Sequence, residues 1–198
     1  MPDNAPRGDG TTGTPFALTT EMTTGAEAEF TPVAIRTRKG RDLKVQMYQS
    51  DDFGTLVQMY KVFQPKRVAQ GLPPPDVPRI AHWLDLLQQK SQSLLAVDGD
   101  RITGHTILCP IRADAVEFTI FVHQDYREEG LGTALSRLML EWAQVAGYSR
   151  VYLTTETSNI RALRLFRKLG FQTTSSSGDE VEMKLDLPAS SIERPQAA

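Results

Sequence analysis

The sequence predicts an α/β domain in which helices flank a mixed sheet. Short apolar segments bounded by turn residues alternate with segments whose apolar residues recur every three or four positions. The strand expected at 116–122 reads VEFTIFV, and such an apolar run is typical of a strand buried on both faces. It leads through a glycine-containing loop directly into a helix expected at 133–146.

Composition sets the broad class of the protein. The chain has 198 residues, of which 40% are hydrophobic and 23% charged, so it can form one domain with a substantial core. A net charge of −2 gives no electrostatic case for nucleic acid or an anionic membrane as a partner. No apolar run approaches the roughly 18 residues of a membrane span.

The ends of the chain and its cysteine content predict the cellular location. The first residues lack the basic start and apolar core of a secretory signal. Cys109 is the only cysteine, which excludes an internal disulfide. We therefore expect a cytoplasmic protein, with a disordered tail at 1–30, one folded domain at 31–187 and a flexible tail at 188–198.

The domain is expected to begin with a hairpin, with strands at 33–38 and 43–49 around a turn at 39–42. A helix capped by Asp51 or Asp52 follows. The apolar residues that share one face of this helix are Leu56, Met59, Tyr60 and Phe63.

A connection at 64–75, with three prolines near its end, leads into a second helix at 77–90. The simplest interpretation of this connection is a stiff linker. Pro78 is tolerated in the first turn of the helix. The apolar residues on one face of the helix are Ile80, Trp83, Leu84 and Leu87.

A second hairpin joins strands at 94–97 and 102–109 through the turn Asp98-Gly99-Asp100-Arg101. Cys109 closes the second of these strands and is expected to serve packing. The next strand is expected at 113–122, which includes the apolar run described above.

The last elements follow in regular order. Gly147 is expected to end the helix at 133–146 as a left-handed cap. A buried strand at 151–155 precedes a helix at 159–169 that Gly170 closes. The chain ends in a hairpin, with strands at 171–174 and 181–185 around a turn at 175–178.

The loop Arg127-Glu128-Glu129-Gly130-Leu131-Gly132 joins the central strand to its helix. Two glycines spaced by one residue allow a sharp turn and a close approach of a ligand to the backbone. Successive N–H groups at a helix N-terminus favour an anion, so the loop predicts a phosphate site. The loop lacks the Lys-Ser/Thr of a Walker motif and the third glycine of a dinucleotide fingerprint. An ordinary strand-to-helix turn is the alternative.

The R-x-x-G-x-G pattern after a buried strand resembles the acetyl-coenzyme A signature of the GCN5-related N-acetyltransferases, the GNAT family. Residues 159–171, with Asn159 at the start and Gly170-Phe171 at the end, resemble the second signature of that family. The two stand in the family's order and at its usual separation. The resemblance is clear over 93–187 and looser from Leu43. It implies the acyl-CoA N-acyltransferase fold, with a central, mostly antiparallel mixed sheet and about four helices.

The resemblance also implies how acetyl-coenzyme A would bind, without a metal ion. Backbone N–H groups from Glu128 to Thr133 would hold the pyrophosphate. The pantetheine arm would pair with the main chain of 120–122, in a gap that the family opens between this strand and 151–155. Asn159 would touch the pantetheine or sulfur region, although a plain helix N-cap is its alternative role. The implied cofactor-binding residues are Ile120, Phe121, Val122, Arg127, Glu128, Glu129, Gly130, Leu131, Gly132, Thr133, Asn159 and Phe166.

The implied activity is transfer of an acetyl group to a primary amine by direct attack. A small molecule or a protein would supply the amine, and the connection 64–75 would form one wall of the acceptor site. The alternative is a module that binds acyl-coenzyme A without catalysis. Dimers are common in the family, so a homodimer is an open expectation.

Glu117 is the best candidate for the general base, because a carboxylate inside an apolar strand requires a reason. A shift of register by one residue would reverse the face on which it lies. Its alternative role is an ion pair with a neighbouring arginine such as Arg112. His105 and Glu156 are weaker candidates for the base. Two further residues are expected to shape the mouth of the loop, namely His123 and Tyr126.

Two features depart from the family pattern. Phe166 stands where many members carry a tyrosine that protonates the leaving thiolate. A thiol with a pKa near 8.5 can leave without such an acid. Glu128 and Glu129 stand where basic or small residues are common, and their charges would oppose a phosphate unless they point to solvent. We therefore expect weaker cofactor binding.

Overall fold

The computed structural model describes residues 30–66 and 71–188. The tails predicted at 1–30 and 188–198 thus lie outside the described residues, except at Phe30 and Pro188. Phe30 is partly buried and packs against the larger of the two hydrophobic cores described below. Within the described ranges, no helix combines the length and the apolar character needed to cross a membrane.

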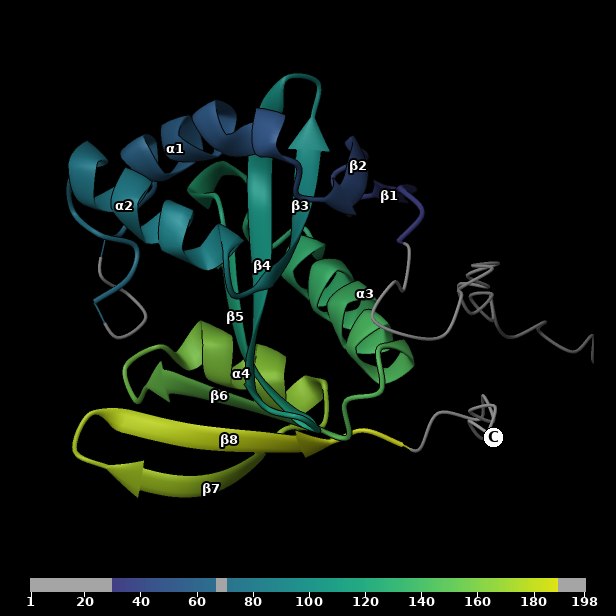
Figure 1. The fold of residues 1–198 in the computed structure, drawn as a ribbon, viewed down its shortest axis with the longest axis vertical. Helices are drawn as coiled ribbons and strands as arrows, with labels where there is room; N and C mark the ends of the chain where they lie inside the picture. The colour runs from purple at the N-terminus through teal and green to yellow at the C-terminus, as the bar shows by residue number, and fades with distance from the viewer. Residues whose placement is uncertain (1–29, 67–70, 189–198) are drawn as a thin grey trace, which may run out of the picture.

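The described residues form one eight-stranded sheet with four helices around it, which confirms the predicted fold class (Figure 1). The strand order is β1-β2-β3-β4-β5-β6-β8-β7, and β5–β6 is its one parallel pair. The strands are β1 (Val33–Arg36), β2 (Asp42–Met47), β3 (Gln92–Asp98), β4 (Arg101–Arg112), β5 (Ala115–Val122), β6 (Arg150–Glu156), β7 (Gln172–Ser177) and β8 (Glu180–Asp186). The helices are α1 (Phe53–Val62), α2 (Val77–Gln88), α3 (Leu131–Val145) and α4 (Ile160–Lys168), with short 3-10 turns η1 (Ser50–Asp52) and η2 (Gln124–Tyr126).

β4 and β7 each end three residues later than their sequence patterns predicted. β4 continues past Cys109 to Arg112, with a register shift at Pro110, which has no N–H group to donate to the ladder. β7 continues through the serines predicted as a turn, and the turn itself is at Gly178-Asp179. β7 is an exposed edge strand, so it needs no apolar residues to remain paired.

The helix ends follow local sequence signals, with one exception. Gly147 and Gly170 have φ values of 91° and 96°, which confirms them as left-handed caps. Asp76 caps α2 by accepting a hydrogen bond from the Arg79 N–H at 3.0 Å. Asp52 precedes α1 but makes no side-chain cap, because its carboxylate accepts the backbone N–H of Gln49 at 2.9 Å instead.

The sheet carries a hydrophobic core on each face (Figure 1). The larger core lies under α3 and α4, and the smaller one lies under α1 and α2. Successive residues of β3 alternate between them: Leu94 and Ala96 belong to the larger core and Leu95 to the smaller. The same alternation on β4 and β5 decides which of their side chains face α1 and α2.

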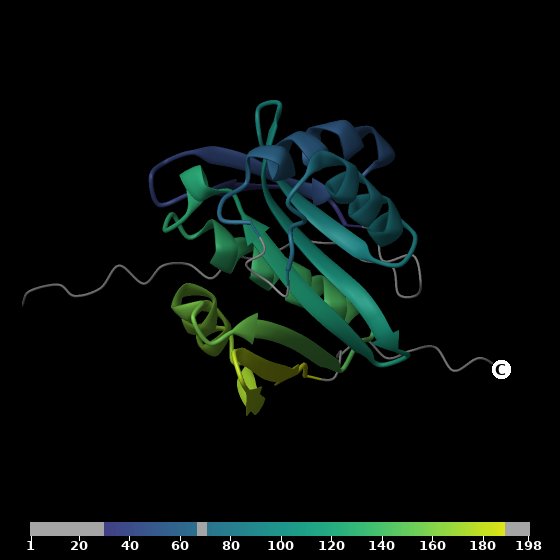
Figure 2. The ribbon, with the colours of Figure 1, turned by 90° about the vertical axis from the view of Figure 1, so that its left-hand side faces the viewer.

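The sheet opens between β5 and β6. These strands pair only at Ala115–Arg150, Val116–Val151 and Glu117–Tyr152, and Figure 2 shows them diverging beyond that point. The main chain of β5 from Phe118 to Val122 therefore has no strand partner on the β6 side. This confirms the gap that the sequence resemblance implied.

Candidate active site

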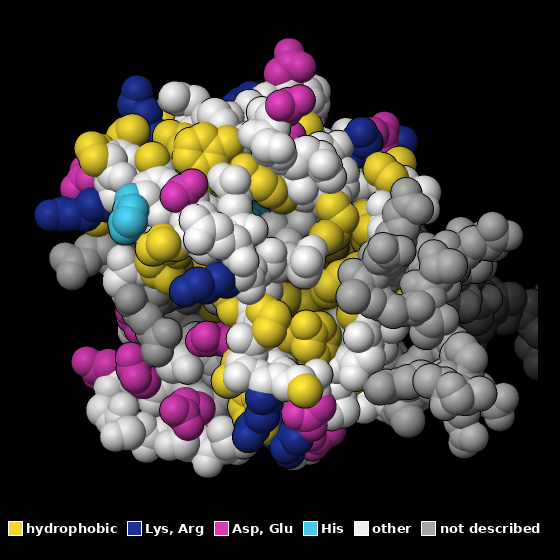
Figure 3. Space-filling view, in the orientation of Figure 1, with side chains coloured by type: hydrophobic (Ala, Val, Ile, Leu, Met, Phe, Trp, Pro, Cys, Tyr) yellow, Lys and Arg dark blue, Asp and Glu magenta, His cyan; other side chains and the backbone are white. Residues whose placement is uncertain are grey.

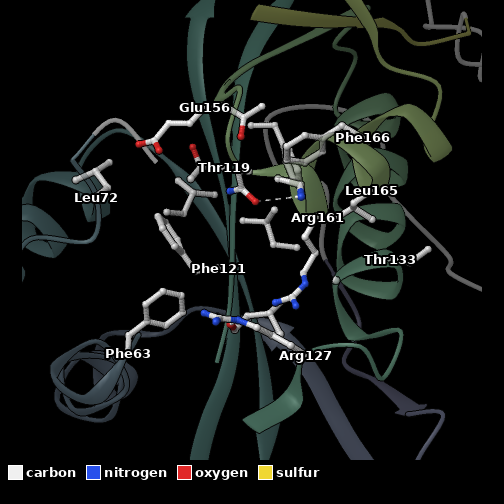
Figure 4. A pocket seen from close by; sticks show the side chains of 18 of the residues that line it. Phe63, Leu72, Thr119, Phe121, Arg127, Thr133, Glu156, Arg161, Leu165 and Phe166 are labelled. Carbon is white, nitrogen blue, oxygen red and sulfur yellow. Dashed lines mark hydrogen bonds between the residues drawn. The ribbon is translucent and has the colours of Figure 1, made fainter. Parts of the chain in front are cut away.

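A single cavity of about 720 Å³ occupies this opening, a size typical of ligand sites. It is lined by β4, β5, β6, the loop before α3, α4, the residue that follows α1, the connection from α1 to α2 and the inner face of α2. In Figure 4, Phe63, Leu72 and Phe121 lie on one side of the central strand, and Thr133, Leu165 and Phe166 lie on the other. We call these the α1–α2 side and the α3–α4 side of the pocket.

The loop at 127–132 has the backbone shape of an anion site. Glu128 has φ 64° and is the one non-glycine residue of the described part with a positive value; Gly130 follows with φ 90°. A turn with positive φ values can point backbone N–H groups toward one side, as in an anion-binding nest. α3 begins directly after Gly130, so the positive end of its dipole lies at this loop. The phosphate site stays a prediction, and these two features favour it.

Glu129 faces neither the pocket nor solvent, contrary to the orientation that phosphate binding was expected to require. Its side chain is 0% exposed and lies under the turn between β1 and β2. The Thr37 hydroxyl donates to Oε2 at 3.0 Å. Two cations approach Oε1, with Lys39 Nζ at 3.2 Å and Arg41 Nη2 at 3.5 Å. The Arg38 N–H donates to the Glu129 carbonyl at 2.8 Å, so the hairpin holds the loop through both side chain and main chain.

The charge of Glu129 is compensated where it lies. Burial raises the pKa of Glu129, but the hydrogen bonds of Lys39 and Thr37 and the charge of Arg41 outweigh burial, so the pKa is below its ordinary value. The side chain of Leu131 is also buried away from the pocket. Of the implied cofactor-binding residues, these two would therefore contribute only backbone groups.

Glu128 does reach the edge of the pocket, where it pairs with Arg161 of α4 at 2.7 Å. Both side chains are mostly exposed, at 72% and 62%. Three arginines line the pocket near this loop, Arg38, Arg127 and Arg161. Only Arg127 was predicted, because the other two lie in distant segments of the sequence that carry no phosphate motif.

Arg127 connects the two sides of the pocket (Figure 4). Its Nε donates to the Val122 carbonyl at 3.1 Å, and its Nη2 donates to the Gln64 carbonyl. The guanidinium lies 5.2 Å from the centre of the Phe63 ring. One carbonyl of the predicted pantetheine-pairing segment 120–122 thus already accepts a hydrogen bond.

Asn159 and Phe166 both line the α3–α4 side. Asn159 Oδ1 accepts the N–H of Ala162 at 3.2 Å, so this residue is a helix N-cap as well as a pocket residue. The Phe166 ring packs edge-on against Phe118 and Phe171, at centroid distances of 6.2 and 5.8 Å. It forms an apolar wall and has no proton to donate.

Glu117 lies at the last paired position before the sheet opens, and its side chain lines the pocket. It stands beside Cys109 of β4 and Tyr152 of β6. Arg112, its suggested partner, donates instead to the Tyr152 hydroxyl at 3.4 Å. Among the ion pairs of the described residues, none includes Glu117. Burial and the charge of Glu117 raise the pKa of the Cys109 thiol, which therefore stays protonated at neutral pH.

The two weaker candidates for the base differ in position. His105 is 1% exposed and does not line this pocket. Its Nδ1 shares a hydrogen bond of 2.8 Å with the Tyr60 hydroxyl, and burial lowers its pKa to about 3. This location does not support His105 as the base. Glu156 does line the pocket and accepts the Ser158 hydroxyl at 3.2 Å.

The two residues expected at the mouth of the loop pack together, with ring centroids 6.2 Å apart. Tyr126 lines the pocket, and its hydroxyl donates to Asp98 Oδ2 at 2.7 Å. His123 is buried against it and does not line the pocket.

The aromatic wall on the α1–α2 side was not predicted. Trp83 was expected only as part of an apolar helix face, yet it lines the pocket, with its ring centroid 5.9 Å from that of Phe121. Pro65 and Leu72 of the connection 64–75 also line the pocket. The resemblance implied that this connection forms one wall of the acceptor site. Its residues 67–70 lie outside the described residues. The signal that could have identified Trp83 is that it is the one aromatic residue among the apolar residues Ile80, Trp83, Leu84 and Leu87 of this helix face.

The likeness to solved structures is one of fold. The GNAT domain of S. lividans PAT has a TM-score of 0.66 at 20% identity, over 79% of this chain and 97% of that one. A phosphinothricin acetyltransferase from Sinorhizobium meliloti, solved in complex with AcCoA, has a TM-score of 0.63 at 16% identity, over 78% of this chain and 94% of that one. The yncA protein of Salmonella typhimurium, described as a putative acetyltransferase with its cofactor acetyl-CoA, has 0.62 at 19%, over 76% and 96%.

Sequence comparisons identify shorter stretches. N-acetyltransferase 8 of Homo sapiens is 38% identical over 60 residues, 30% of this chain and 26% of that protein. An uncharacterized N-acetyltransferase of Bacillus subtilis, YobR, is 36% identical over 56 residues, 28% of this chain and 23% of that protein. The chain thus matches about a quarter of the length of these relatives. The family model "Acetyltransferase (GNAT) family" matches residues 56–171, more than half of the chain. The chain therefore belongs to the GNAT acetyltransferase family.

Proposed function

We propose that this chain is an N-acetyltransferase that moves an acetyl group from acetyl-coenzyme A to a primary amine by direct attack. The observation that carries the proposal is the opening of the sheet beside Glu117, directly adjacent to a loop with an anion-binding backbone. The positive φ values of Glu128 and Gly130 and the N-terminus of α3 suit a diphosphate, and the unpaired edge of β5 suits a narrow, amide-containing arm.

The residues present fit the coenzyme. The N–H groups of 128–133 would hold the pyrophosphate, with Arg38, Arg127 and Arg161 as nearby cations. The main chain of Phe118–Val122 would pair with the pantetheine arm, because β6 does not occupy that edge. Asn159 Oδ1 is committed to the Ala162 N–H, which leaves its amide N–H groups for a ligand. When bound, the coenzyme supplies the acetyl group as a thioester.

Glu117 would remove the proton of the attacking amine. At pH 7, making an amine with a pKa near 10.4 neutral costs about 4 to 5 kcal/mol, so a carboxylate base within reach of it assists the attack. A bond forms between the amine nitrogen and the acetyl carbon, the carbon–sulfur bond breaks, and the thiolate leaves. Phe166 cannot protonate that thiolate. The thiolate is a weak enough base to leave without protonation by the protein. Holding the two reactants in line supplies roughly 7 to 11 kcal/mol of the barrier.

The proposal is tested with the full chain by measuring free-thiol release across a panel of primary amines, together with calorimetry of coenzyme binding. We expect turnover, and Glu117→Gln should lower kcat by about 100-fold or more with the Kd for coenzyme unchanged. Glu182→Gln, on the exposed side of β8, is the matched control and should change neither value.

Two results would count against the proposal. Binding of coenzyme without thiol release beyond solvent hydrolysis, for every amine, would favour a non-catalytic sensor of acyl-coenzyme A, the role for which Phe166 in place of a tyrosine is the motivation. Absence of coenzyme binding would remove both the enzyme and the sensor.

A further inference from the structure

The α1–α2 side of the pocket has a composition that selects among amines. We propose that the acceptor is a primary amine with an aromatic or branched aliphatic body and no second charge. This inference rests on the proposed function, because it assigns the acceptor to the side of the sheet opening that the coenzyme does not fill.

The floor of this side comes from two neighbouring strands. On β4 and β5, Cys109 lies opposite Glu117, and Ile107 lies opposite Thr119. All four line the pocket, and the even-numbered neighbours Leu108 and Phe118 belong to the other core. A carboxylate is thus set at one end of an otherwise weakly polar floor. An ammonium group at Glu117 would place the body of the acceptor over Ile107 and Thr119.

The walls of this side are aromatic and rigid. Phe63 and Phe121 are each 2% exposed and pack edge-on at 5.7 Å. Trp83 packs edge-on against Phe121 at 5.9 Å and against Tyr60 at 5.0 Å. Each ring is therefore held by others, and a ligand ring would add to an existing edge-to-face arrangement. Leu72 closes the same side in Figure 4.

The charges around this side argue against a polycationic acceptor. Among the described lining residues that α2, the connection before it, β4 and β5 contribute, Glu117 is the one Asp, Glu, Lys or Arg. Arg127 borders it, but its donors already serve the carbonyls of Val122 and Gln64. Glu156 lies across the opening on β6. A second ammonium group on the acceptor would enter an apolar surface without a partner, which is unfavourable.

Hydrophobic and acidic side chains occupy different parts of the face shown in Figure 3. Hydrophobic side chains extend from the region of α1 and α2 toward the middle of this face, and acidic side chains are more frequent below, in the part that carries β6, β7 and β8.

The test compares amines of similar basicity and different bodies. With the full chain and saturating acetyl-coenzyme A, kcat/KM is measured for 2-phenylethylamine, 3-methylbutylamine, ethylamine, pentylamine and 1,5-diaminopentane. We expect 2-phenylethylamine to exceed ethylamine by about 100-fold, since each methylene in an apolar pocket contributes about tenfold or more. Pentylamine should exceed 1,5-diaminopentane by about tenfold, because the diamine adds only a charge.

Variants connect the preference to the wall. Trp83→Ala should lower kcat/KM for 2-phenylethylamine by about 30-fold and for ethylamine by less than threefold, with the Kd for coenzyme unchanged. Leu86→Ala is the control, since Leu86 is on the same helix, is 44% exposed and does not line the pocket. If Trp83→Ala does not fold, Leu72→Ala tests the same side from the connection, outside both helices.

A binding measurement separates this inference from the proposed function. Cys109, the only cysteine, lines the floor, so its alkylation by iodoacetamide at about pH 9, where the thiolate begins to form, can be followed by mass. With desulfo-coenzyme A present, which has no thiol to compete for the reagent, 2-phenylethylamine should slow the alkylation at least fivefold, and 1,5-diaminopentane at the same concentration should not.

Three combinations of results separate the inference about the acceptor from the proposed acetyltransferase function. Thiol release that favours the diamine, or an equal loss for all amines in Trp83→Ala, overturns the inference and leaves the acetyltransferase intact. No thiol release with any amine, together with protection of Cys109 by 2-phenylethylamine, removes the acetyltransferase and supports the site for apolar amines. Neither release nor protection overturns both.

Discussion

The loop at 127–132 and the aromatic wall differ in what holds them in place. The loop is held by directional contacts, in which Thr37, Lys39 and Arg41 converge on the carboxylate of Glu129. The wall is held by packing among the rings of Tyr60, Phe63, Trp83 and Phe121. Directional contacts fix one geometry, whereas apolar packing tolerates changes of shape at constant volume. The part that would hold the invariant coenzyme is thus the more tightly specified of the two.

The two adjacent glutamates of the loop give the largest expected contrast. Glu129→Gln leaves Lys39 and Arg41 beside a neutral group in a buried place, so the loop should lose its fixed shape. We expect the Kd for coenzyme A to rise by about 30-fold in calorimetry. Glu128→Gln removes an exposed ion pair with Arg161 and should change Kd by less than threefold. Equal effects of both changes would show that the contacts of Thr37, Lys39 and Arg41 with Glu129 do not hold the loop in place.

Acid should weaken the two regions in different pH ranges. The pKa of His105, on the wall side, is lowered by burial to about 3, below the ordinary value of 6.5. As the pH falls, His105 is protonated in the unfolded chain before it is protonated in the folded chain. The stability that neutral His105 contributes above pH 6.5 is therefore lost as the pH falls toward 3. At pH 5 the loss is about 2 kcal/mol relative to pH 7.5.

The measurement is the free energy of urea unfolding of the wild type and of His105→Gln between pH 7.5 and 4. The difference between them should shrink across this range. Glu129 has a pKa below its ordinary value of 4.5, so its contribution is present above pH 4.5 and is lost only at lower pH. His82→Gln is the control for the histidine, and a pH profile unchanged in His105→Gln would contradict the assignment.

Gly130→Ala should affect the loop less than Glu129→Gln does. Gly130 has φ 90°, and a Cβ there would lie 3.4 Å from Arg38 Nε. The positive φ alone costs roughly 1 to 2 kcal/mol for alanine, so we expect coenzyme affinity to fall by about tenfold. Gly178→Ala, also with positive φ but with nothing nearby, should lower the melting temperature without changing that affinity. Unchanged binding in Gly130→Ala would mean that the loop adapts to the methyl group.

Local patterns in the sequence predicted what depends on neighbours along the chain. The buried strand β5, the glycine loop and the Asn159 cap follow from spacing and propensity within about fifteen residues. The contacts that hold the Glu129 side chain could not be predicted, because Thr37 lies 92 residues away and nothing in either segment indicates that the two meet. The aromatic wall was missed for a similar reason, since Trp83 approaches Phe121 only when α2 packs on the sheet.

The sequence also could not determine on which face of a strand a given side chain lies. Glu117 could be predicted as an unusual residue, but its face depended on the register, and β4 shifts register at Pro110 close to it. From the sequence alone, His105 could serve as a base, because any histidine can accept a proton. Its burial against Tyr60 decides that it is a neutral core residue.

Arg127 has a consequence for how the two substrates influence each other. One guanidinium contacts the end of β5, the carbonyl of Gln64 and the ring of Phe63. If a diphosphate draws this group toward the loop, the segment after α1 loses its anchor, and the aromatic wall must readjust. Thermodynamic reciprocity then requires the acceptor to alter coenzyme affinity by the same factor. A shared side chain of this kind would make the affinity for each ligand depend on whether the other is bound.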